Sequence, residues 1–371
     1  MWNRKEIISK KNAILNRLKN CNNSREEEIL LRSLSYYVQM LENSQNIIKL
    51  NFSESFYEIF GNKIKLFDPA FKASLKLNDY NLKNYMDKNY FDFLVNLSEN
   101  ISYSFTFDNS KLIELDNIFL SEADLINMSK EFYNEFLGDE EIAQKANIIL
   151  DNPNYINRTE KYVNEYSDSS GLTFIDYFNK EVYCSVLKKN TIAEYQSLNH
   201  EVMHGVDCYF KFKLPSESYE GFHEIPTYTI DFLFMDFLDL KGFETQNLRM
   251  NKDRYLRCKA SSFYKLFKRL IKAKCGIVVV DCKSYKDRLE IVDDSCLNIL
   301  KEVESFVIAY GLYNQIKKDK NFGIDNLKKL MSTTFPKNKK PDFSFIDLDD
   351  DCLLNLSNEI NFNSKEKEKR L

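Results

Sequence analysis

The chain has 371 residues, and its 52 basic and 56 acidic side chains leave a net charge of −4. Because the two signs are mixed along the sequence, no basic stripe indicates a nucleic-acid partner. No window approaches the roughly 18 to 20 apolar residues that a membrane-spanning helix needs, and the N-terminal stretch "MWNRKEIISKKNAILNRL" lacks the continuous apolar run of a secretory signal. We therefore expect a cytoplasmic protein without a nucleic-acid or membrane partner.

Cysteine, glycine and proline usage indicates a reduced, mainly helical protein. The eight cysteines contain no C-x-x-C pair, and a chain of this length does not need disulfides to be stable. Nine glycines and six prolines provide few turn signals. This scarcity favours long helices joined by short loops over a sheet-based fold. The expected fold class is mainly α.

The first part of the sequence predicts a helical N-terminal lobe over residues 1–105. Residues 28–41 repeat apolar side chains at helical spacing, and a second helical run covers residues 81–101.

Beyond this lobe, a further helical run spans residues 121–150. Ser121 is placed to cap this helix, and Asp124 follows three residues later, which is the spacing of a capping box.

A small β element is expected before the next helix. Residues 172–178 and 182–189 are rich in β-branched and aromatic side chains on either side of Asn179 and Lys180, which predicts a hairpin. Residues 276–282 are also strand-like. Four helices are predicted in the rest of the chain, over residues 191–212, 223–240, 254–273 and 297–319. Residues 346–371 form a C-terminal segment whose charged end is expected to be disordered.

The stretch "LNHEVMHG", residues 198–205, contains a His-Glu-x-x-His motif. On a helix, His200 and His204 share one face because residues four apart are neighbours. Two neutral imidazoles in this arrangement suit a zinc ion, and Glu201 would act as the base that takes a proton from a zinc-bound water. Such a site still requires a third ligand.

A carboxylate is the expected third ligand. The H-x-x-G-x-x-H extension, which supplies a third histidine ligand in metzincins, is absent after His204. Glu224 opens the next predicted helix, and a ligand on a rigid element is positioned better than one on a loop. Glu217 and Glu220 in the intervening loop, and Asp207 three residues after His204, remain alternatives.

"SLNHEVMHG" followed by "FHEIPTYTIDFLFMDFL" resembles the core of the thimet oligopeptidase and oligoendopeptidase F family of zinc metallopeptidases. In that family a glutamate ligand begins a helix, as Glu224 does here, and a second acid follows seven residues later, at the position of Asp231. The resemblance covers about residues 110 to 335 and implies one zinc ion per chain, a nearly all-α two-lobed body and a deep channel for short peptides. Asp231 is either a residue that orients a ligand histidine through its second ring nitrogen or a solvated helix acid. His223 would point to another face, for packing or substrate contact.

The sequence departs from the family pattern in several places. Met203 replaces the usual glycine before the second histidine, and the N-terminal half is short. No histidine follows His223, so the family's late histidine and tyrosine cluster is not reproduced. We assign no catalytic role to Tyr310 and Tyr313, because helical tyrosines are more often packed in the core.

These residues predict a zincin-type metallopeptidase core in a catalytic domain over residues 106–345. The expected function is that of a zinc-dependent endopeptidase or oligopeptidase, which hydrolyses peptide bonds by Glu201-assisted attack of a zinc-bound water. The partner is then a peptide or polypeptide substrate. Hydrolysis of another amide is one alternative. A catalytically weak or inactive zinc-containing peptide-binding protein is the other.

Overall fold

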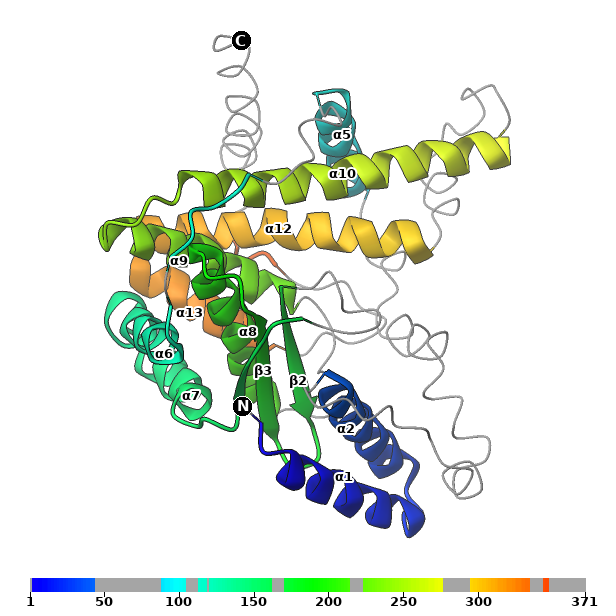
Figure 1. Ribbon diagram of the computed structural model, residues 1–371. Coiled ribbons are helices and arrows are strands. Elements are labelled where there is room, and N and C mark those ends of the chain that lie inside the picture. Colours follow the sequence, from blue (N-terminus) through cyan, green and yellow to red (C-terminus); the bar gives the residue numbers. More distant parts are fainter. Residues whose placement is uncertain are drawn as a thin grey trace. The chain divides into compact units, whose positions relative to one another are not determined.

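The computed structural model describes residues 2–43, 88–104, 113–118, 120–161, 170–213, 223–275, 294–333 and 343–346. Over these residues the protein is mainly helical with one small sheet, as predicted (Figure 1). Three predicted features lie outside the described residues: the domain limit at residue 105, the strand-like residues 276–282, and the charged C-terminal end after Ile346.

The chain forms two compact units. The first comprises Met1–Asp79, Asp116–Tyr219 and Met331–Thr334, and the second comprises Tyr80–Leu115, Glu220–Leu330 and Phe335–Leu371. Each unit is described by itself below. The sequence-based domain limits stay predictions.

The first unit contains the sheet and the helix that carries the His-Glu-x-x-His motif. Its elements are α1 (Arg4–Lys19), α2 (Ser24–Asn43), α6 (Glu122–Glu131), the π-helix η4 (Phe132–Leu137), α7 (Glu140–Leu150), β1 (Ile156–Thr159), β2 (Gly171–Asp176), β3 (Glu181–Leu187) and α8 (Ile192–Lys211). The motif helix α8 agrees with its predicted range to within one residue at each end.

The three strands have the order β1-β3-β2. β2 and β3 form the predicted antiparallel hairpin, with Thr173 opposite Cys184. β1 pairs in parallel with β3, so that Ile156 lies opposite Cys184. β1 was not predicted. The hairpin turn is shaped by Asp176, whose Oδ1 accepts from the backbone N–H groups of Phe178 and Asn179 at 2.9 Å each.

The two faces of the sheet are covered by different helices. α8 packs on one face, and α2 packs on β2 from the other (Figure 1). Phe174 and Tyr183 share a hydrophobic cluster with Trp2 and residues of α1 and α2, including Leu30 and Leu34. The Tyr37 hydroxyl donates to Asp176, which fastens α2 to the hairpin.

The predicted helix over residues 121–150 is interrupted. Ser121 caps α6 in the predicted capping box, because its side chain accepts from the N–H of Asp124 at 3.1 Å and Asp124 accepts in return. The helix continues from α6 into η4 and ends at Gly138, whose φ of 66° is in the left-handed region. Asp139 begins α7 by accepting from the N–H of Ile142 at 2.9 Å. The prediction of one continuous helix was therefore wrong.

The second unit is helical in its described part. It contains α5 (Lys88–Ser104), α9 (Glu224–Leu240), α10 (Gln246–Cys275), α12 (Asp294–Lys318) and most of α13 (Lys320–Met331). α12 packs along both α9 and α10, and α5 packs on α10 (Figure 1). Gly323 brings α13 close to α12, since a Cβ at this position would lie 2.5 Å from the backbone nitrogen of Ile316. Among the described helices, none is long and apolar enough to cross a bilayer.

Candidate metal centre and motif helix

A buried ion pair fixes the start of α8. Glu194, in the first turn, is fully buried and paired with Arg158 of β1. Its Oε2 also accepts from the backbone N–H groups of Lys189 at 3.0 Å and Asn190 at 2.9 Å. Removing one partner of such a pair is costly, because a buried charge would lose its compensation. The helix therefore begins from a defined position relative to the sheet.

His200 and His204 lie one helical turn apart on α8, as predicted. Their ring centroids are 4.9 Å apart, and the ring planes are inclined at 84°. Both side chains are half-buried. The residue before the motif is held by η4, since the Tyr133 hydroxyl donates to the carbonyl oxygen of Asn199 at 3.1 Å. The two imidazoles thus belong to a turn that is packed on both sides.

Glu201 lies on the side of α8 that faces the sheet. Only 6% of the residue is exposed. The Thr173 hydroxyl lies 2.6 Å from Glu201 Oε2 and 3.0 Å from the Glu201 carbonyl oxygen. The Cys184 thiol lies 3.4 Å from the same carbonyl oxygen. Burial, followed by the nearby charge of Glu201, raises the pKa of the Cys184 thiol well above its ordinary value.

Glu224 is the first residue of α9, as predicted. Its carboxylate accepts from the Thr227 hydroxyl at 3.3 Å, and its carbonyl oxygen accepts from the same hydroxyl at 2.9 Å. A negative side chain is favoured at this end of a helix. His223 is exposed, with Nε2 3.4 Å from Glu224 Oε1. Burial, then the charge of Glu224, raises the pKa of Tyr228 one turn further along α9.

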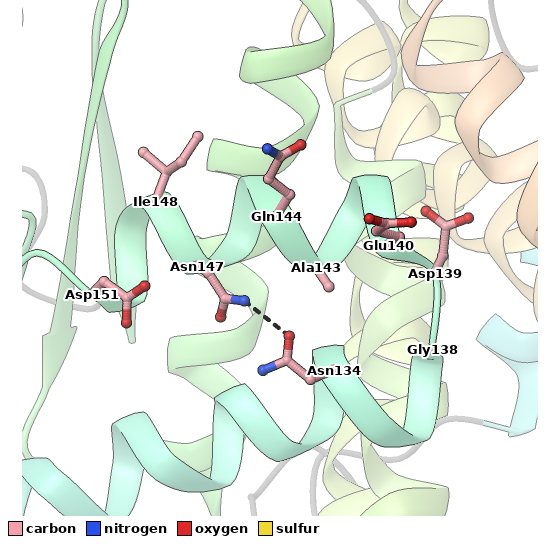
Figure 2. A pocket seen from close by; sticks show the side chains of 9 residues that line it. All are labelled: Asn134, Gly138, Asp139, Glu140, Ala143, Gln144, Asn147, Ile148 and Asp151. Atoms are coloured by element: carbon pink, nitrogen blue, oxygen red, sulfur yellow. Dashed lines mark hydrogen bonds between the residues drawn. The ribbon is translucent and has the colours of Figure 1, made fainter.

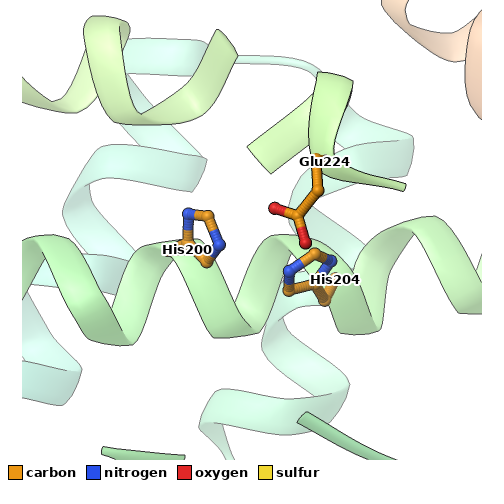
Figure 3. Close-up of side chains that lie close together, drawn as sticks. All are labelled: His200, His204 and Glu224. Carbon is orange, nitrogen blue, oxygen red and sulfur yellow. The ribbon is translucent and has the colours of Figure 1, made fainter. Parts of the chain in front are cut away.

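Figure 3 shows His200, His204 and Glu224 together. Each residue offers one ligand atom, and these atoms all lie within 4.8 Å of one another. Two imidazole nitrogens and one carboxylate oxygen form a donor set that suits zinc in hydrolytic sites, where the fourth position is left to water or substrate. The residues present therefore fit a zinc ion by their chemistry.

The alternative third ligands have other surroundings. Asp207 is buried, and its Oδ2 is 2.5 Å from the buried Lys211 ammonium group one turn along α8. That ion pair gives Asp207 a partner within its own helix. Glu217 and Glu220 lie outside the described residues. Of the two candidates among the described residues, Glu224 and Asp207, Glu224 is the one grouped with both histidines.

Asp231 is buried on α9 and forms an ion pair with Lys252 of α10. The Lys252 ammonium group also lies 4.2 Å from the centre of the Tyr228 ring. Asp231 is therefore not a solvated helix acid. Its predicted role in orienting a ligand histidine stays a prediction.

Met203, Tyr310 and Tyr313 are buried in the cores of their respective units. Met203 is fully buried, so its large side chain packs within the core of the first unit. The glycine that permits close packing on α8 is Gly205, where a Cβ would lie 2.3 Å from Ile149 Cδ1 and 2.8 Å from Val182 Cγ1. The Tyr313 hydroxyl donates to Asp236 at 2.9 Å.

A separate open pocket lies between η4 and α7 in the first unit. Figure 2 shows its lining, in which Asn147 Nδ2 donates to Asn134 Oδ1 at 2.9 Å. The lining residues come from Asn134 to Asp151. This pocket is thus distinct from the motif on α8, and we assign it no function.

The contact between Thr173 and Glu201 was not predicted. The predicted hairpin placed Thr173 in a strand, and nothing in its local sequence separates it from other strand threonines. A signal was available only in combination, because a hairpin expected next to the motif helix must place alternate residues against that helix.

Comparisons with known proteins support the fold. No family model matches the sequence, and no curated protein matches it. Among solved structures, one described as an oligoendopeptidase F from Bacillus anthracis is similar over 100% of this chain and 98% of its own, at 11% identity and a TM-score of 0.53. A structure described as Pz peptidase A with an inhibitor is similar over 95% of this chain and 71% of the Pz peptidase A chain, at 12% identity and a TM-score of 0.49. The chain therefore shares the fold of the protein described as an oligoendopeptidase F.

Proposed function

We propose that this protein is a zinc-dependent endopeptidase or oligopeptidase. The observation that carries the proposal is the grouping of His200, His204 and Glu224, whose ligand atoms lie within 4.8 Å of one another. The adjacent Glu201 supplies a carboxylate that a purely structural zinc site does not need. The shared fold with a protein described as an oligoendopeptidase F agrees with a peptide substrate.

His200, His204 and Glu224 would hold one zinc ion through two imidazole nitrogens and one carboxylate oxygen. Zinc in such a set supplies a Lewis acid that lowers the pKa of a water molecule and polarises a carbonyl group. The neutral forms of both imidazoles are required, so protonation of either histidine at low pH competes with the metal.

Glu201 would act as the general base and then as the general acid. Its carboxylate accepts a proton from the water that attacks the scissile carbonyl carbon. It then returns that proton to the amine that leaves as the C–N bond breaks. A correctly placed carboxylate of this kind contributes about 10²- to 10⁴-fold to the rate.

The test compares the zinc-loaded protein with its Glu201→Gln variant on a mixed peptide pool analysed by mass spectrometry. Glutamine keeps the size of the side chain but cannot take up the proton. We expect peptide cuts by the wild type and a rate lower by about 10²- to 10⁴-fold in the variant. The zinc content of both proteins is measured first, so that any loss of rate refers to equal metal.

Glu122→Gln is the matched control, because Glu122 is an exposed glutamate in the first turn of α6. This variant is expected to cut like the wild type. Equal cutting by the wild type and the Glu201→Gln variant would reject the assigned base. If neither protein cuts while both hold one zinc ion, the peptidase proposal fails and the zinc-containing peptide-binding alternative takes its place.

A further inference from the structure

We propose that Gly171 and Thr173 of β2 are positioning residues for the Glu201 carboxylate. This inference rests on the proposed function, because it concerns the placement of the base in that reaction. Both residues lie in the same strand, two positions apart, and therefore on the same face of the sheet. That face is covered by α8, which carries Glu201.

Thr173 acts by hydrogen bonding. Its hydroxyl is 2.6 Å from Glu201 Oε2 and 3.0 Å from the Glu201 carbonyl oxygen. A hydroxyl has a single proton, and a charged oxygen is the stronger acceptor. Donation to the carboxylate therefore dominates when Glu201 is ionised. One of the two carboxylate oxygens is thereby tied to β2.

Gly171 acts by leaving space. A Cβ at Gly171 would lie 2.5 Å from Glu201 Oε1, 2.6 Å from Cγ and 2.8 Å from Cδ. The volume that any other residue would fill is occupied by the Glu201 side chain. Gly171 is not among the residues with positive φ. The backbone itself would accept alanine, so the need for glycine at this position comes from Glu201.

Together the two residues define where the carboxylate lies. Thr173 attracts Oε2, and the bare backbone of Gly171 admits Oε1 and the end of the side chain. The Cys184 thiol, opposite Thr173 in the hairpin, contacts the Glu201 carbonyl oxygen at 3.4 Å and braces its backbone. Glu201 is therefore held at both its backbone and its side chain by the hairpin.

The kinetic test uses Gly171→Ala and Thr173→Val, each loaded with zinc. For Thr173→Val we expect kcat to fall about 10- to 100-fold, the effect of losing one hydrogen bond to a charged group. For Gly171→Ala we expect a fall of about 100-fold, because a shift of a catalytic group by about 1 Å has an effect of this size. KM and zinc affinity should stay at their wild-type values. Thr173→Ser, which keeps the hydroxyl, should restore kcat.

Thr159→Val is the matched control. Thr159 is a buried threonine in β1 whose hydroxyl donates to the carbonyl oxygen of Lys161 at 3.0 Å. It undergoes the same chemical change at the opposite edge of the same sheet, away from Glu201. We expect its kcat to match that of the wild type. If kcat fell equally in Thr159→Val and Thr173→Val, the cause would be a general destabilisation of the sheet. That result would overturn the inference.

A second measurement does not depend on activity. In metal-free protein, the urea midpoint of unfolding is compared for Gly171→Ala, Glu201→Ala and the double variant. Because Glu201→Ala empties the space beside Gly171, we expect Gly171→Ala to lower the midpoint in the presence of Glu201 and to leave it unchanged or raised in its absence. Additive shifts would show that the two residues do not compete for space and would overturn the inference.

The failures of the two proposals are distinguishable. If the wild type cuts peptides but Gly171→Ala and Thr173→Val keep the wild-type kcat, the positioning role is wrong and the peptidase function stands. If the zinc-loaded wild type cuts nothing, the peptidase function and the positioning role fall together.

Discussion

The two faces of the small sheet use the same strands for different purposes. The face toward α1 and α2 carries large aromatic side chains. The ring centroids of Phe174 and Trp2 are 5.4 Å apart in an edge-to-face arrangement. On the face toward α8, β2 places Gly171 and Thr173 against Glu201. The aromatic side chains fill the core, whereas Gly171 leaves room for the Glu201 side chain. The sheet thus carries its aromatic packing on one face and its contacts with the Glu201 carboxylate on the other.

Gly171 and Gly205 extend this contrast to single positions. A Cβ at Gly171 would meet the side chain of Glu201, and a Cβ at Gly205 would meet Ile149 and Val182. The first glycine makes room for a chemical group, and the second lets α8 approach β3 and α7. Changes at the two glycines should therefore have different consequences, although both are Gly→Ala.

The largest effect on stability is expected on the aromatic face. Phe174→Ala removes a ring that is 2% exposed and contacts the rings of Trp2 and Tyr36. We expect a loss of about 3–5 kcal/mol in the free energy of unfolding, measured by urea denaturation of the metal-free protein. Phe322→Ala is the control, because Phe322 is 56% exposed. A surface change of this kind shifts stability by about 0.5 kcal/mol or less. Similar losses in the two variants would remove the basis for calling this face the core.

Much of this arrangement could be predicted from the sequence. Apolar periodicity gave α8 and α9 nearly to the residue, and strand-forming residues around Asn179 and Lys180 gave the hairpin. The motif spacing gave His200 and His204 on one helical face. These features were accessible because each depends on residues that are close in the sequence.

Other features depend on distant contacts and could not be predicted in this way. β1 spans four residues with a single aliphatic one, Ile156, and exists through its parallel pairing with β3. The contacts of Glu201 with Gly171 and Thr173 join residues about thirty positions apart, across a helix–sheet interface. The break at Gly138 is different, because a glycine followed by a capping aspartate was a readable local signal.

A smaller effect is expected at the glycine that packs α8. Gly205→Ala places a methyl group 2.3 Å from Ile149 Cδ1. Overpacking costs about 1–3 kcal/mol, and the gain in helix propensity returns up to about 1 kcal/mol. We expect a net loss of about 1–2 kcal/mol in the free energy of unfolding, measured in urea. Ile149→Val removes the Cδ1 atom, so adding it to Gly205→Ala should recover part of the loss. Strictly additive losses in the double variant would contradict the predicted clash.

The smallest effect is confined to high pH and to the aromatic face. Burial raises the pKa of Tyr36, which packs on Phe174, to about 12. The folded state then holds this proton more tightly than the unfolded state, whose tyrosines titrate near pH 10. The contribution of Tyr36 to stability is complete below pH 10 and is lost as the pH rises to about 12. We expect the unfolding free energy of Tyr36→Phe to fall less steeply than that of the wild type over this interval, in urea titrations at successive pH values. The two proteins should show similar pH dependence between pH 8 and 9, which serves as the internal control. Parallel curves up to pH 12 would mean that the folded protein does not shield the Tyr36 hydroxyl from solvent.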